Sequence, residues 1–306
     1  MKKAVTTLHT YNSISELMKQ LEQPKPFHPL VALINYNEIK ISLADAGNKL
    51  ALDFYKISFK TSFNGQVKYG QGYYDFSEGG LAFLAPNQIV TMSDDEKGYE
   101  GYALFFHPDL IRNYPLGTAI QKYGFFSYSV SEALFLSEKE KLVIAALFES
   151  IAAELDNNID HFSQDVLVSQ IELLLNYSNR YYNRQFITRK SVHHDLIDRL
   201  NAYLSDRFDT QKSYLSGLPT VQEVSDHLNV SPRYLTDMLK SLTGQSTQQH
   251  IHNQLIEKSK KILSNTSLTI AEIAYELGFE HPQSFNKLFK QKTNLSPLEF
   301  RQTFDL

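Results

Sequence analysis

Cysteine and tryptophan do not occur in this chain of 306 residues. Without cysteine, the protein can form no disulfide framework, no thiolate zinc site and no catalytic thiol. Long apolar runs do not occur either: the closest, residues 142–148, falls far short of the ~20 apolar residues that a membrane span needs. Residues 1–10 carry threonines and a histidine where a signal peptide would have an apolar core. These absences predict a cytoplasmic protein without a membrane segment.

Charge and aromatic content divide the chain into two unlike parts. Of its 30 Lys and Arg and 34 Asp and Glu, 15 and 13 lie in residues 184–306, which leaves 15 and 21 in residues 1–183. Of the 38 Phe and Tyr, 27 lie in the first part, which favours strands there and helices in the second. The net positive second part indicates an anionic partner.

The first part changes its pattern near Ser137. Before it, short apolar and aromatic runs separated by turn residues predict strands of a sandwich or small barrel. These runs are residues 30–34, 54–59, 81–84 and 102–106. After Ser137 the spacing is helical, with one predicted apolar stripe through positions 142, 145, 146, 149 and 153 and a second helix over residues 166–176.

The last third of the chain contains the same unit twice. Residues 220–225 match residues 269–274 in size and polarity, and the match continues through a second helix opened by a proline. Between the two helices stands a residue that accepts left-handed backbone, Asn229 or Gly278. Each copy therefore predicts a helix-turn-helix.

The second helix of each copy has an apolar and a polar face. Met238 and three leucines recur at helical spacing in the first copy, and Phe285, Leu288 and Phe289 do so in the second, so they are expected to pack inward. The opposite faces carry side chains that suit base edges and phosphates. These outward candidates for DNA contact are Arg233, Thr236, Asp237, Lys240, Gln283, Asn286, Lys287 and Lys290.

A further helix is predicted between the copies, over residues 248–263. At 1.5 Å per residue, its ~16 residues span ~24 Å. With the widths of the two outer helices added, this approaches the ~34 Å repeat of a DNA duplex. The linking helix could therefore hold both units in successive major-groove turns.

Residues 193–304 resemble the C-terminal DNA-binding domain of the AraC/XylS family of bacterial transcription regulators. The most specific stretches are residues 273–279 (Ile-Ala-Tyr-Glu-Leu-Gly-Phe), residues 284–290 (Ser-Phe-Asn-Lys-Leu-Phe-Lys) and residues 296–301 (Ser-Pro-Leu-Glu-Phe-Arg). The resemblance implies two helix-turn-helix units joined by a long helix, each inserting one helix into the major groove. The base-reading positions that it implies are Arg233, Thr236, Asp237, Gln283, Asn286 and Lys287, with His281 at the leading edge. Ser284 is expected to cap its helix or to contact phosphate.

Three positions depart from the family pattern. Leu255 stands where many members have an arginine in the linking helix, and Asn294 replaces a glycine that the first unit retains as Gly244. Asp237 is acidic, so that beside DNA it would favour a cytosine amino group and repel phosphate. The second unit therefore fits the DNA-reading pattern better than the first.

The first part of the chain resembles the cupin-type barrel that many family members use for effector binding or pairing. The likeness rests on the short strands, on the turn Glu78-Gly79-Gly80 followed by residues 81–86, and on residues 105–108 (Phe-Phe-His-Pro). A metal cupin needs clustered histidines with a carboxylate.

The histidines of the chain do not form such a cluster in the sequence. His9, His28 and His107 are isolated from one another, so no metal and no other cofactor is predicted. His193 and His194 are expected to form an exposed helix start instead of a metal pair.

The predicted fold class is α+β, with a cupin-like barrel and flanking helices followed by an all-α domain with two helix-turn-helix units. The expected domains are a sensor domain (residues 1–136), a helical dimerisation segment (137–183), a linker (184–192) and a double helix-turn-helix domain (193–306).

The predicted function is an effector-responsive transcription regulator, not an enzyme, which reads two successive major-groove turns of promoter DNA. The expected partners are double-stranded DNA, a small-molecule effector of unknown identity, a second copy in a homodimer, and RNA polymerase. Two alternatives remain open. One is a cupin-like metalloenzyme with a helical appendage, and the other is a DNA-binding protein without an effector, whose barrel only pairs subunits.

Overall fold

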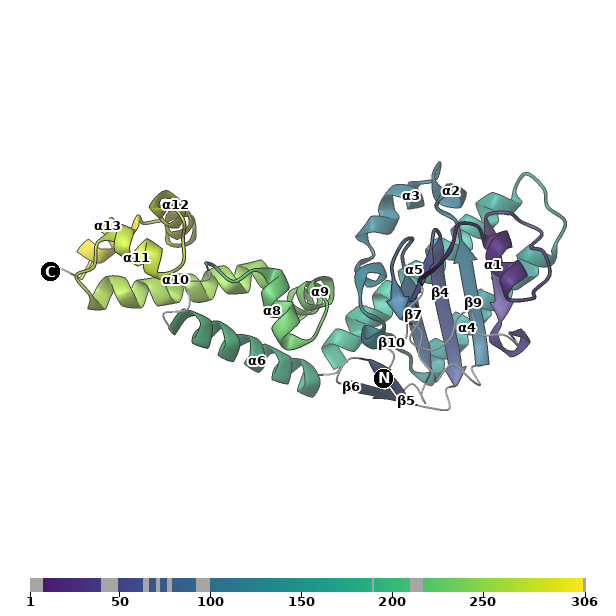
Figure 1. Cartoon of the computed structure of the whole chain (residues 1–306), viewed down its shortest axis with the longest axis horizontal. Coiled ribbons are helices and arrows are strands. Elements are labelled where there is room, and N and C mark those ends of the chain that lie inside the picture. Colours follow the sequence, from purple (N-terminus) through teal and green to yellow (C-terminus); the bar gives the residue numbers. More distant parts are fainter. Residues whose placement is uncertain are drawn as a thin grey trace, which may run out of the picture. The chain divides into compact units, whose positions relative to one another are not determined.

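A computed structural model describes residues 8–39, 49–62, 66–69, 72–75, 79–91, 100–188, 190–209 and 217–304. The chain divides into two compact units, Met1–Gln185 and Phe186–Leu306. The N-terminal unit combines sheets with helices, and the described residues of the C-terminal unit form helices and short connections (Figure 1). The predicted α+β class is therefore confirmed. None of the helices in the described ranges is long and apolar enough to cross a membrane.

The described strands of the N-terminal unit group into three sheets. The largest has the order β10-β7-β4-β9-β2 with antiparallel neighbours, while β1, β3 and β8 form a second sheet and β5 and β6 a third. The strands are β1 (Leu8–Tyr11), β2 (Val31–Asn35), β3 (Lys49–Leu52), β4 (Tyr55–Ser62), β5 (Gln66–Tyr69), β6 (Gly72–Asp75), β7 (Gly80–Leu84), β8 (Val90–Thr91), β9 (Glu100–Phe106) and β10 (Leu134–Phe135).

The four runs predicted as strands are confirmed as β2, β4, β7 and β9. Closure of these strands into a cupin-like barrel stays a prediction. Glu78, in the turn that carried part of the cupin likeness, lies outside the described residues. No group of three or more His, Asp or Glu side chains that could hold a metal occurs in the ranges described.

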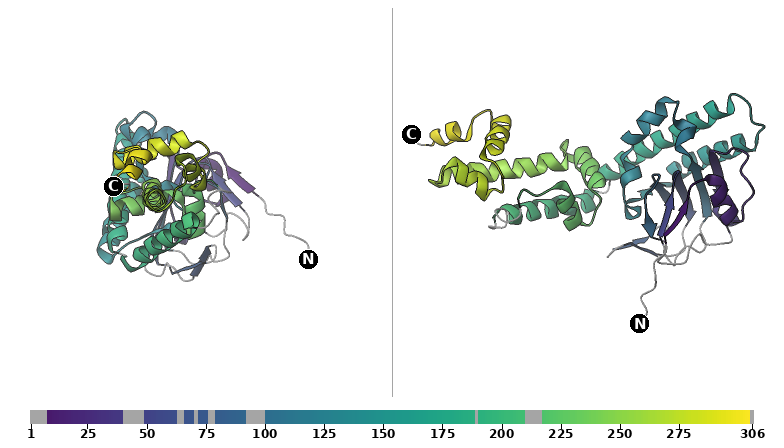
Figure 2. Two further views of the ribbon diagram at one scale, coloured as in Figure 1. Left: turned by 90° about the vertical axis from the view of Figure 1, so that its left-hand side faces the viewer. Right: turned by 45° about the horizontal axis from the view of Figure 1, so that its top comes forward.

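One face of the five-stranded sheet is covered by helices α4 (Glu138–Asp156) and α5 (Ser163–Thr188) (Figure 2). Phe59 of β4 and Tyr102 of β9 both stack on Phe148 of α4, with ring centroids 5.5 and 5.7 Å apart. Phe83 of β7 lies 6.2 Å from Tyr182 of α5, measured between the ring centroids. Because side chains alternate along a strand, these aromatic residues share one face and form one core.

The opposite face of the sheet packs against helix α1 (Ile14–Gln20). Ala103 and Phe105 of β9 belong to one buried cluster with Ile14, Leu17 and Met18 of α1. Two short helices, α2 (Pro108–Ile111) and α3 (Pro115–Ala119), follow β9 along the chain. The strands that are apolar on both faces in the sequence are thus buried on both faces in the structure.

The apolar stripe predicted after Ser137 lies on a helix, but it does not face the sheet. Leu142 is 72% exposed, and positions 146, 149 and 153 are exposed as well. The buried face of α4 is formed by Ile144, Phe148 and Ile151. Both sets repeat with helical spacing, but the second has the larger side chains and so removes more apolar surface from water.

Most of the stretch predicted as a linker, residues 184–192, is helical. Helix α5 runs to residue 188, and α6 (Lys190–Asp209) begins two residues later. Arg184 donates to both carboxylate oxygens of Glu140, at 2.9 and 2.7 Å, which holds α5 against α4. The division between the compact units falls between Gln185 and Phe186.

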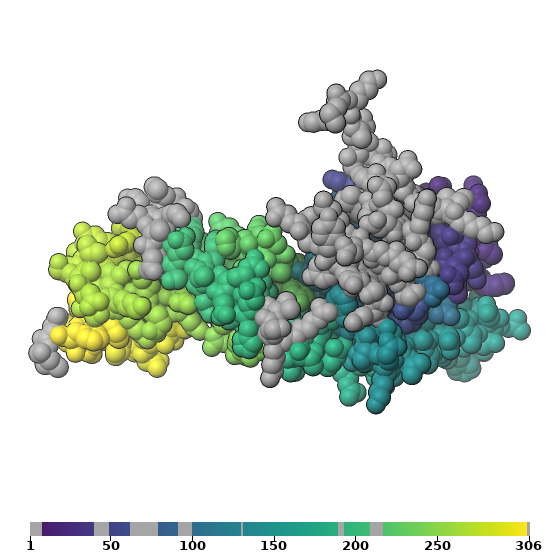
Figure 3. Space-filling model, turned by 90° about the horizontal axis from the view of Figure 1, so that it is seen from below, coloured from purple at the N-terminus to yellow at the C-terminus, as the bar shows by residue number. Residues whose placement is uncertain are grey.

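The C-terminal unit is built around helix α10, which contacts α6, α9, α11, α12 and α13. Helices α8 and α9 lie beside one end of α10, and α11 to α13 lie beside the other (Figure 1). Figure 3 views this unit from the side on which α6 lies. The predicted linking helix is confirmed as α10. The remaining helices are α8 (Val221–Leu228), α9 (Pro232–Thr243), α10 (Thr247–Asn265), α11 (Ile270–Glu276), α12 (Pro282–Thr293) and α13 (Pro297–Gln302).

The expectation that His193 begins an exposed helix is wrong, although His194 is exposed. The His193 side chain is buried, with Nδ1 2.7 Å from the carbonyl oxygen of Phe186 and Nε2 3.3 Å from the hydroxyl of Tyr234. The Phe186 ring also meets the Tyr234 ring edge-on, with centroids 5.3 Å apart. The contacts with Tyr234 join residues about forty positions apart in sequence, so local pattern could not predict them.

Replacing Phe148 tests the packing of α4 on the sheet. Phe148→Ala removes the ring that stacks on two strands and should lower the free energy of unfolding by about 3–5 kcal/mol. Lys139→Ala, at an exposed position of the same helix, should change it by less than ~0.5 kcal/mol. Urea unfolding of the full chain measures both changes, and equal losses would contradict this packing.

Candidate nucleic-acid interface

Helices α8 and α9 form the first helix-turn-helix. Thr220 caps α8: its hydroxyl accepts from the Glu223 backbone N–H at 3.1 Å, and its own N–H donates to the Glu223 carboxylate at 2.7 Å. Helix α8 ends at Asn229, whose φ of 58° is left-handed. Asparagine accepts this backbone more readily than most residues, and the chain then enters α9 at Pro232. The predicted turn is confirmed.

Helices α11 and α12 repeat the arrangement. Thr269 and Glu272 form the same reciprocal cap, and Gly278 takes the left-handed turn with a φ of 90°. Helix α12 ends at Asn294 with a φ of 63°, and α9 ends at Gly244 with a φ of 74°. Asn294 thus adopts the conformation of the glycine that it replaces, so this departure from the family pattern leaves the helix end unchanged.

The inward faces of both second helices are largely as predicted. Leu235, Met238 and Leu239 of α9 are fully buried, as are Phe285 and Phe289 of α12. The remaining predicted members, Leu242 and Leu288, are half-buried. This packing fixes the rotation of each helix about its axis and therefore decides which side chains face outward.

The outward face of α12 presents polar groups that are not engaged elsewhere. In the part of the chain that the structure describes, the exposed side chains of Gln283, Asn286 and Lys287 make no hydrogen bond or ion pair. The other candidates of this unit, His281, Ser284 and Lys290, are exposed too. The structure thus brings all six candidate residues of the second unit to the surface of one helix and its leading edge.

The outward face of α9 is different, because three of its four candidates are engaged. Arg233 Nε donates to Asp237 Oδ2 at 2.9 Å, one helical turn away. The hydroxyls of Thr236 and Thr247 lie 3.0 Å apart, and Thr247 is fully buried at the first position of α10. Lys240 is exposed. The partner Thr247 is not a predicted site residue, although the Ser246–Gln249 capping box that places it at a helix start is visible in the sequence.

The linking helix supplies packing at the position where many family members have an arginine. Leu255 is fully buried, and Ile251 and Ile256 are almost fully buried on the same helix. An arginine could snorkel from such a site, but leucine adds only apolar contact. This position therefore serves the core of the unit.

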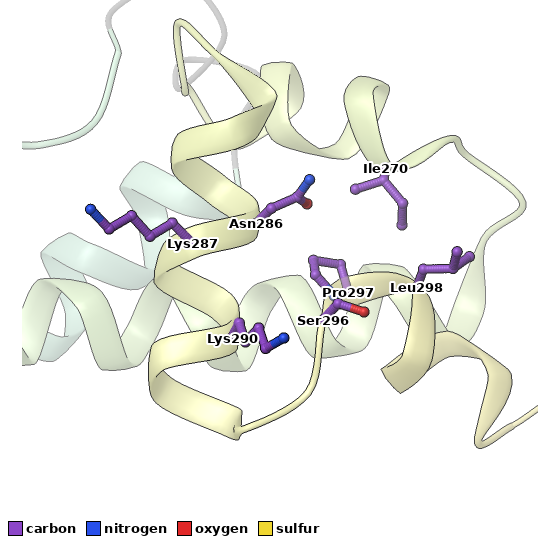
Figure 4. A pocket seen from close by; sticks show the side chains of 7 residues that line it. All are labelled: Ile270, Asn286, Lys287, Lys290, Ser296, Pro297 and Leu298. Atoms are coloured by element: carbon purple, nitrogen blue, oxygen red, sulfur yellow. The ribbon is translucent and has the colours of Figure 1, made fainter.

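A hollow of about 390 Å³ lies beside α12, next to the starts of α11 and α13 (Figure 4). Asn286 points from α12 toward Ile270, and Pro297 and Leu298 complete a mainly apolar wall (Figure 4). Lys287, Lys290 and Ser296 also line the hollow. The polar face of α12 is therefore bordered by a concave apolar surface.

Two family models match this chain in sequence. A helix-turn-helix domain model matches residues 224–303, and an AraC-like ligand binding domain model matches residues 51–171. The chain belongs to the AraC/XylS family of transcriptional regulators. Neither of these two family models describes a metalloenzyme.

Individual relatives agree with the family assignment. The chain is 28% identical over 146 residues to an uncharacterized HTH-type transcriptional regulator, YfiF, of Bacillus subtilis. The matched residues make up 48% of this chain and 43% of that protein. The chain is 27% identical over 143 residues to the HTH-type transcriptional activator RhaS of Escherichia coli, which is 47% of each chain. The chain spans about half the length of the curated relatives it matches.

Solved structures also show similarity. The C-terminal domain of AraT, a response regulator from Geobacillus stearothermophilus, is 30% identical, with coverage of 35% of this chain and 84% of that chain and a TM-score of 0.31. ToxT from Vibrio cholerae is 14% identical, with coverage of 89% of this chain and 97% of that chain and a TM-score of 0.30.

The cap of α11 can be tested through its acid. The hydrogen bonds from the Thr269 backbone and side chain lower the pKa of the Glu272 carboxyl below its ordinary value of 4.5. Because the folded pKa is the lower one, the contact stabilises fully above about pH 4.5 and is lost as the pH falls through the folded pKa. Thr269→Ala keeps the backbone N–H and removes only the hydroxyl, so it should raise the Glu272 pKa part of the way toward 4.5, as measured by carboxyl carbon NMR titration. Thr266→Ala should leave it unchanged; equal shifts in both variants would rule out the cap as the cause.

Proposed function

We propose that this protein is a sequence-specific DNA-binding transcription regulator whose helices α9 and α12 enter successive major-groove turns. The observation that carries the proposal is the duplicated unit. In each copy, buried apolar residues fix the second helix, α9 or α12, so that its polar face lies outward. Helix α10 has 19 residues and therefore spans about 28 Å, which suits two reading helices one duplex turn apart.

The exposed groups on α12 match the chemistry of base edges. Glutamine and asparagine can pair in two places with adenine, and lysine can donate to guanine. Gln283, Asn286 and Lys287 supply these groups, and Lys290 lies one turn further on, where phosphate contact is favourable. His281 and Ser284 at the helix start complete the proposed contact set.

The N-terminal unit is proposed to sense a small molecule, and no catalytic reaction is part of this proposal. The match to an AraC-like ligand binding domain supports this role. An effector can regulate DNA binding only if it binds two arrangements of the protein with different affinities. A rise in melting temperature with an effector would separate this proposal from the alternative in which the N-terminal unit only pairs subunits.

Helices α4 and α5 are proposed to pair two copies of the chain. Both helices expose large apolar side chains, among them Leu142 and Leu173, which are 72% and 46% exposed. Two-fold pairing would place two reading domains on DNA, and RNA polymerase is the proposed further partner at a promoter.

Replacing Lys287 tests the reading role of α12. Lys287→Ala should weaken specific binding by ~1–3 kcal/mol because it removes a donor to a base edge. Fluorescence anisotropy with a duplex enriched by the wild-type chain measures the change. Lys139→Ala removes the same charge from an exposed position on α4 and should have no such effect. Unchanged affinity and sequence preference in Lys287→Ala would defeat the assignment.

Replacing Leu173 tests the proposed pairing of subunits. Leu173→Glu places two like charges in a two-fold interface and should weaken self-association by roughly tenfold or more, or about 1.4 kcal/mol. Sedimentation equilibrium of the full chain measures the dissociation constant. Asn179→Glu adds the same charge to another exposed position of α5. If both variants self-associate as the wild type does, α5 is not the pairing surface.

A further inference from the structure

Asn253, on helix α10, joins the two helix-turn-helix units through hydrogen bonds on both sides of its amide. Its Nδ2 donates to Oε1 of Gln245, in the turn between α9 and α10, at 2.8 Å. Its Oδ1 accepts from Nζ of Lys292, in the last turn of α12, at 3.1 Å. These three side chains form a polar bridge from the end of the first unit to the end of the second.

The lysine decides which way the asparagine amide points. An ammonium group only donates hydrogen bonds, so the amide oxygen must face Lys292 and the amide nitrogen must face Gln245. Asparagine supplies one acceptor and one donor at once, whereas an apolar side chain supplies neither. Asn253 is also half-buried, which strengthens its hydrogen bonds relative to those in open water.

The first end of the polar bridge is fixed to α9. The backbone N–H of Gln245 donates to Oγ1 of Thr243 at 3.2 Å, and this hydroxyl donates to the carbonyl oxygen of Leu239 at 2.8 Å. Leu239 is fully buried in α9. A continuous path of hydrogen bonds therefore leads from the core of the first unit to α12.

The second unit is attached to α10 at a further point. Arg301 of α13 donates from Nε to the carbonyl oxygen of Leu263 at 3.4 Å. Leu263 follows Asn253 by ten residues, so the two attachments lie about 15 Å apart along α10. Two attachments at this distance resist tilting of the unit against α10. Without the polar bridge, only the packing of the core would oppose this tilt at the α12 side.

We propose that Asn253 is a positioning residue that fixes the spacing and phase of α9 and α12, so that the protein selects one separation between the two DNA half-sites that these helices read. The inference rests on the proposed function, and it assigns discrimination between spacings to the polar bridge. Inserting one base pair moves the second half-site by ~3.4 Å and turns it by ~34°. A stiff pair of units loses contacts on such DNA, whereas a loosened pair can follow it.

Binding to duplexes of altered spacing tests the inference with the full chain. The wild-type protein first enriches a duplex from a random library, and its footprint identifies the two half-sites. Fluorescence anisotropy then measures Kd for this duplex and for one with a base pair inserted between the half-sites. We define the spacing ratio as the second Kd divided by the first. A variant that is only less stable keeps its spacing ratio, because both constants change alike, and its melting temperature reports the loss.

The wild-type spacing ratio should be roughly tenfold or more, since the insertion removes at least one base contact. Asn253→Ala should lower the ratio about three- to tenfold, as the loss of one or two hydrogen bonds does. Lys292→Met should lower it to a similar extent, and the double variant no further, because both changes release α12 from the polar bridge. Asn253→Asp should keep most of it, because the carboxylate accepts from Lys292 and the Gln245 amide can turn its nitrogen inward.

Two matched controls should keep the wild-type spacing ratio. Gln254→Ala removes from α10 a neighbouring side-chain amide that makes no hydrogen bond within the described ranges. Lys261→Met removes the same charge as Lys292→Met from an exposed position of α10. A general loss of attraction to phosphate changes both dissociation constants alike and cancels in the ratio.

Three results would overturn the inference and leave the proposed function intact. One is a spacing ratio that Asn253→Ala or Lys292→Met does not change, as expected if Lys292 only contacts phosphate. Another is an equal fall of the ratio in Gln254→Ala or Lys261→Met, or in Asn253→Asp relative to Asn253→Ala. The third is a wild-type chain that binds both duplexes equally well. If the wild-type chain enriches no sequence at all, the proposed function itself fails, and the inference falls with it.

Discussion

The buried side of helix α10 is the contact on which the C-terminal unit depends. A protein that reads two turns of a duplex must hold two helices at a fixed spacing, because the repeat of the DNA is fixed. Ile251, Leu255, Ile256 and Leu263 are buried along α10, which contacts both α9 and α12. One helix therefore sets the separation of the two helices that we propose to read DNA, and it also forms part of both their cores.

Sequence periodicity predicted the helices and strands of this fold better than it predicted which of them pack against each other. The strands, the duplicated unit and its left-handed turn at Asn229 all follow from local pattern and backbone preference. Periodicity did not show which side of α4 meets the sheet, because this helix carries two apolar faces and only the position of the sheet decides between them. His193 failed for a similar reason, since its burial depends on Tyr234 from a distant helix.

The candidate site shows the same limit at the level of side chains. Helical spacing correctly identified the outward faces of α9 and α12, because the inward apolar sets are strong. It could not show that the candidates on α9 are engaged with each other or with α10. The Arg233–Asp237 spacing is visible in the sequence, but the contact between Thr236 and Thr247 depends on how α10 leaves the turn at Gly244. The chemistry of the two units therefore differs more than their shared pattern suggests.

The capping boxes have a consequence for how quickly each unit folds. In the C-terminal unit, Thr220, Ser246, Thr269 and Ser296 each fix a helix start through a residue only three positions away. In the N-terminal unit, β2 must instead pair with β9, and this brings together Val31 and Phe106, which lie far apart in the sequence. Local contacts form before distant ones because closing a long loop costs entropy. We expect the C-terminal unit to reach its native state first, although it is synthesised after the N-terminal unit.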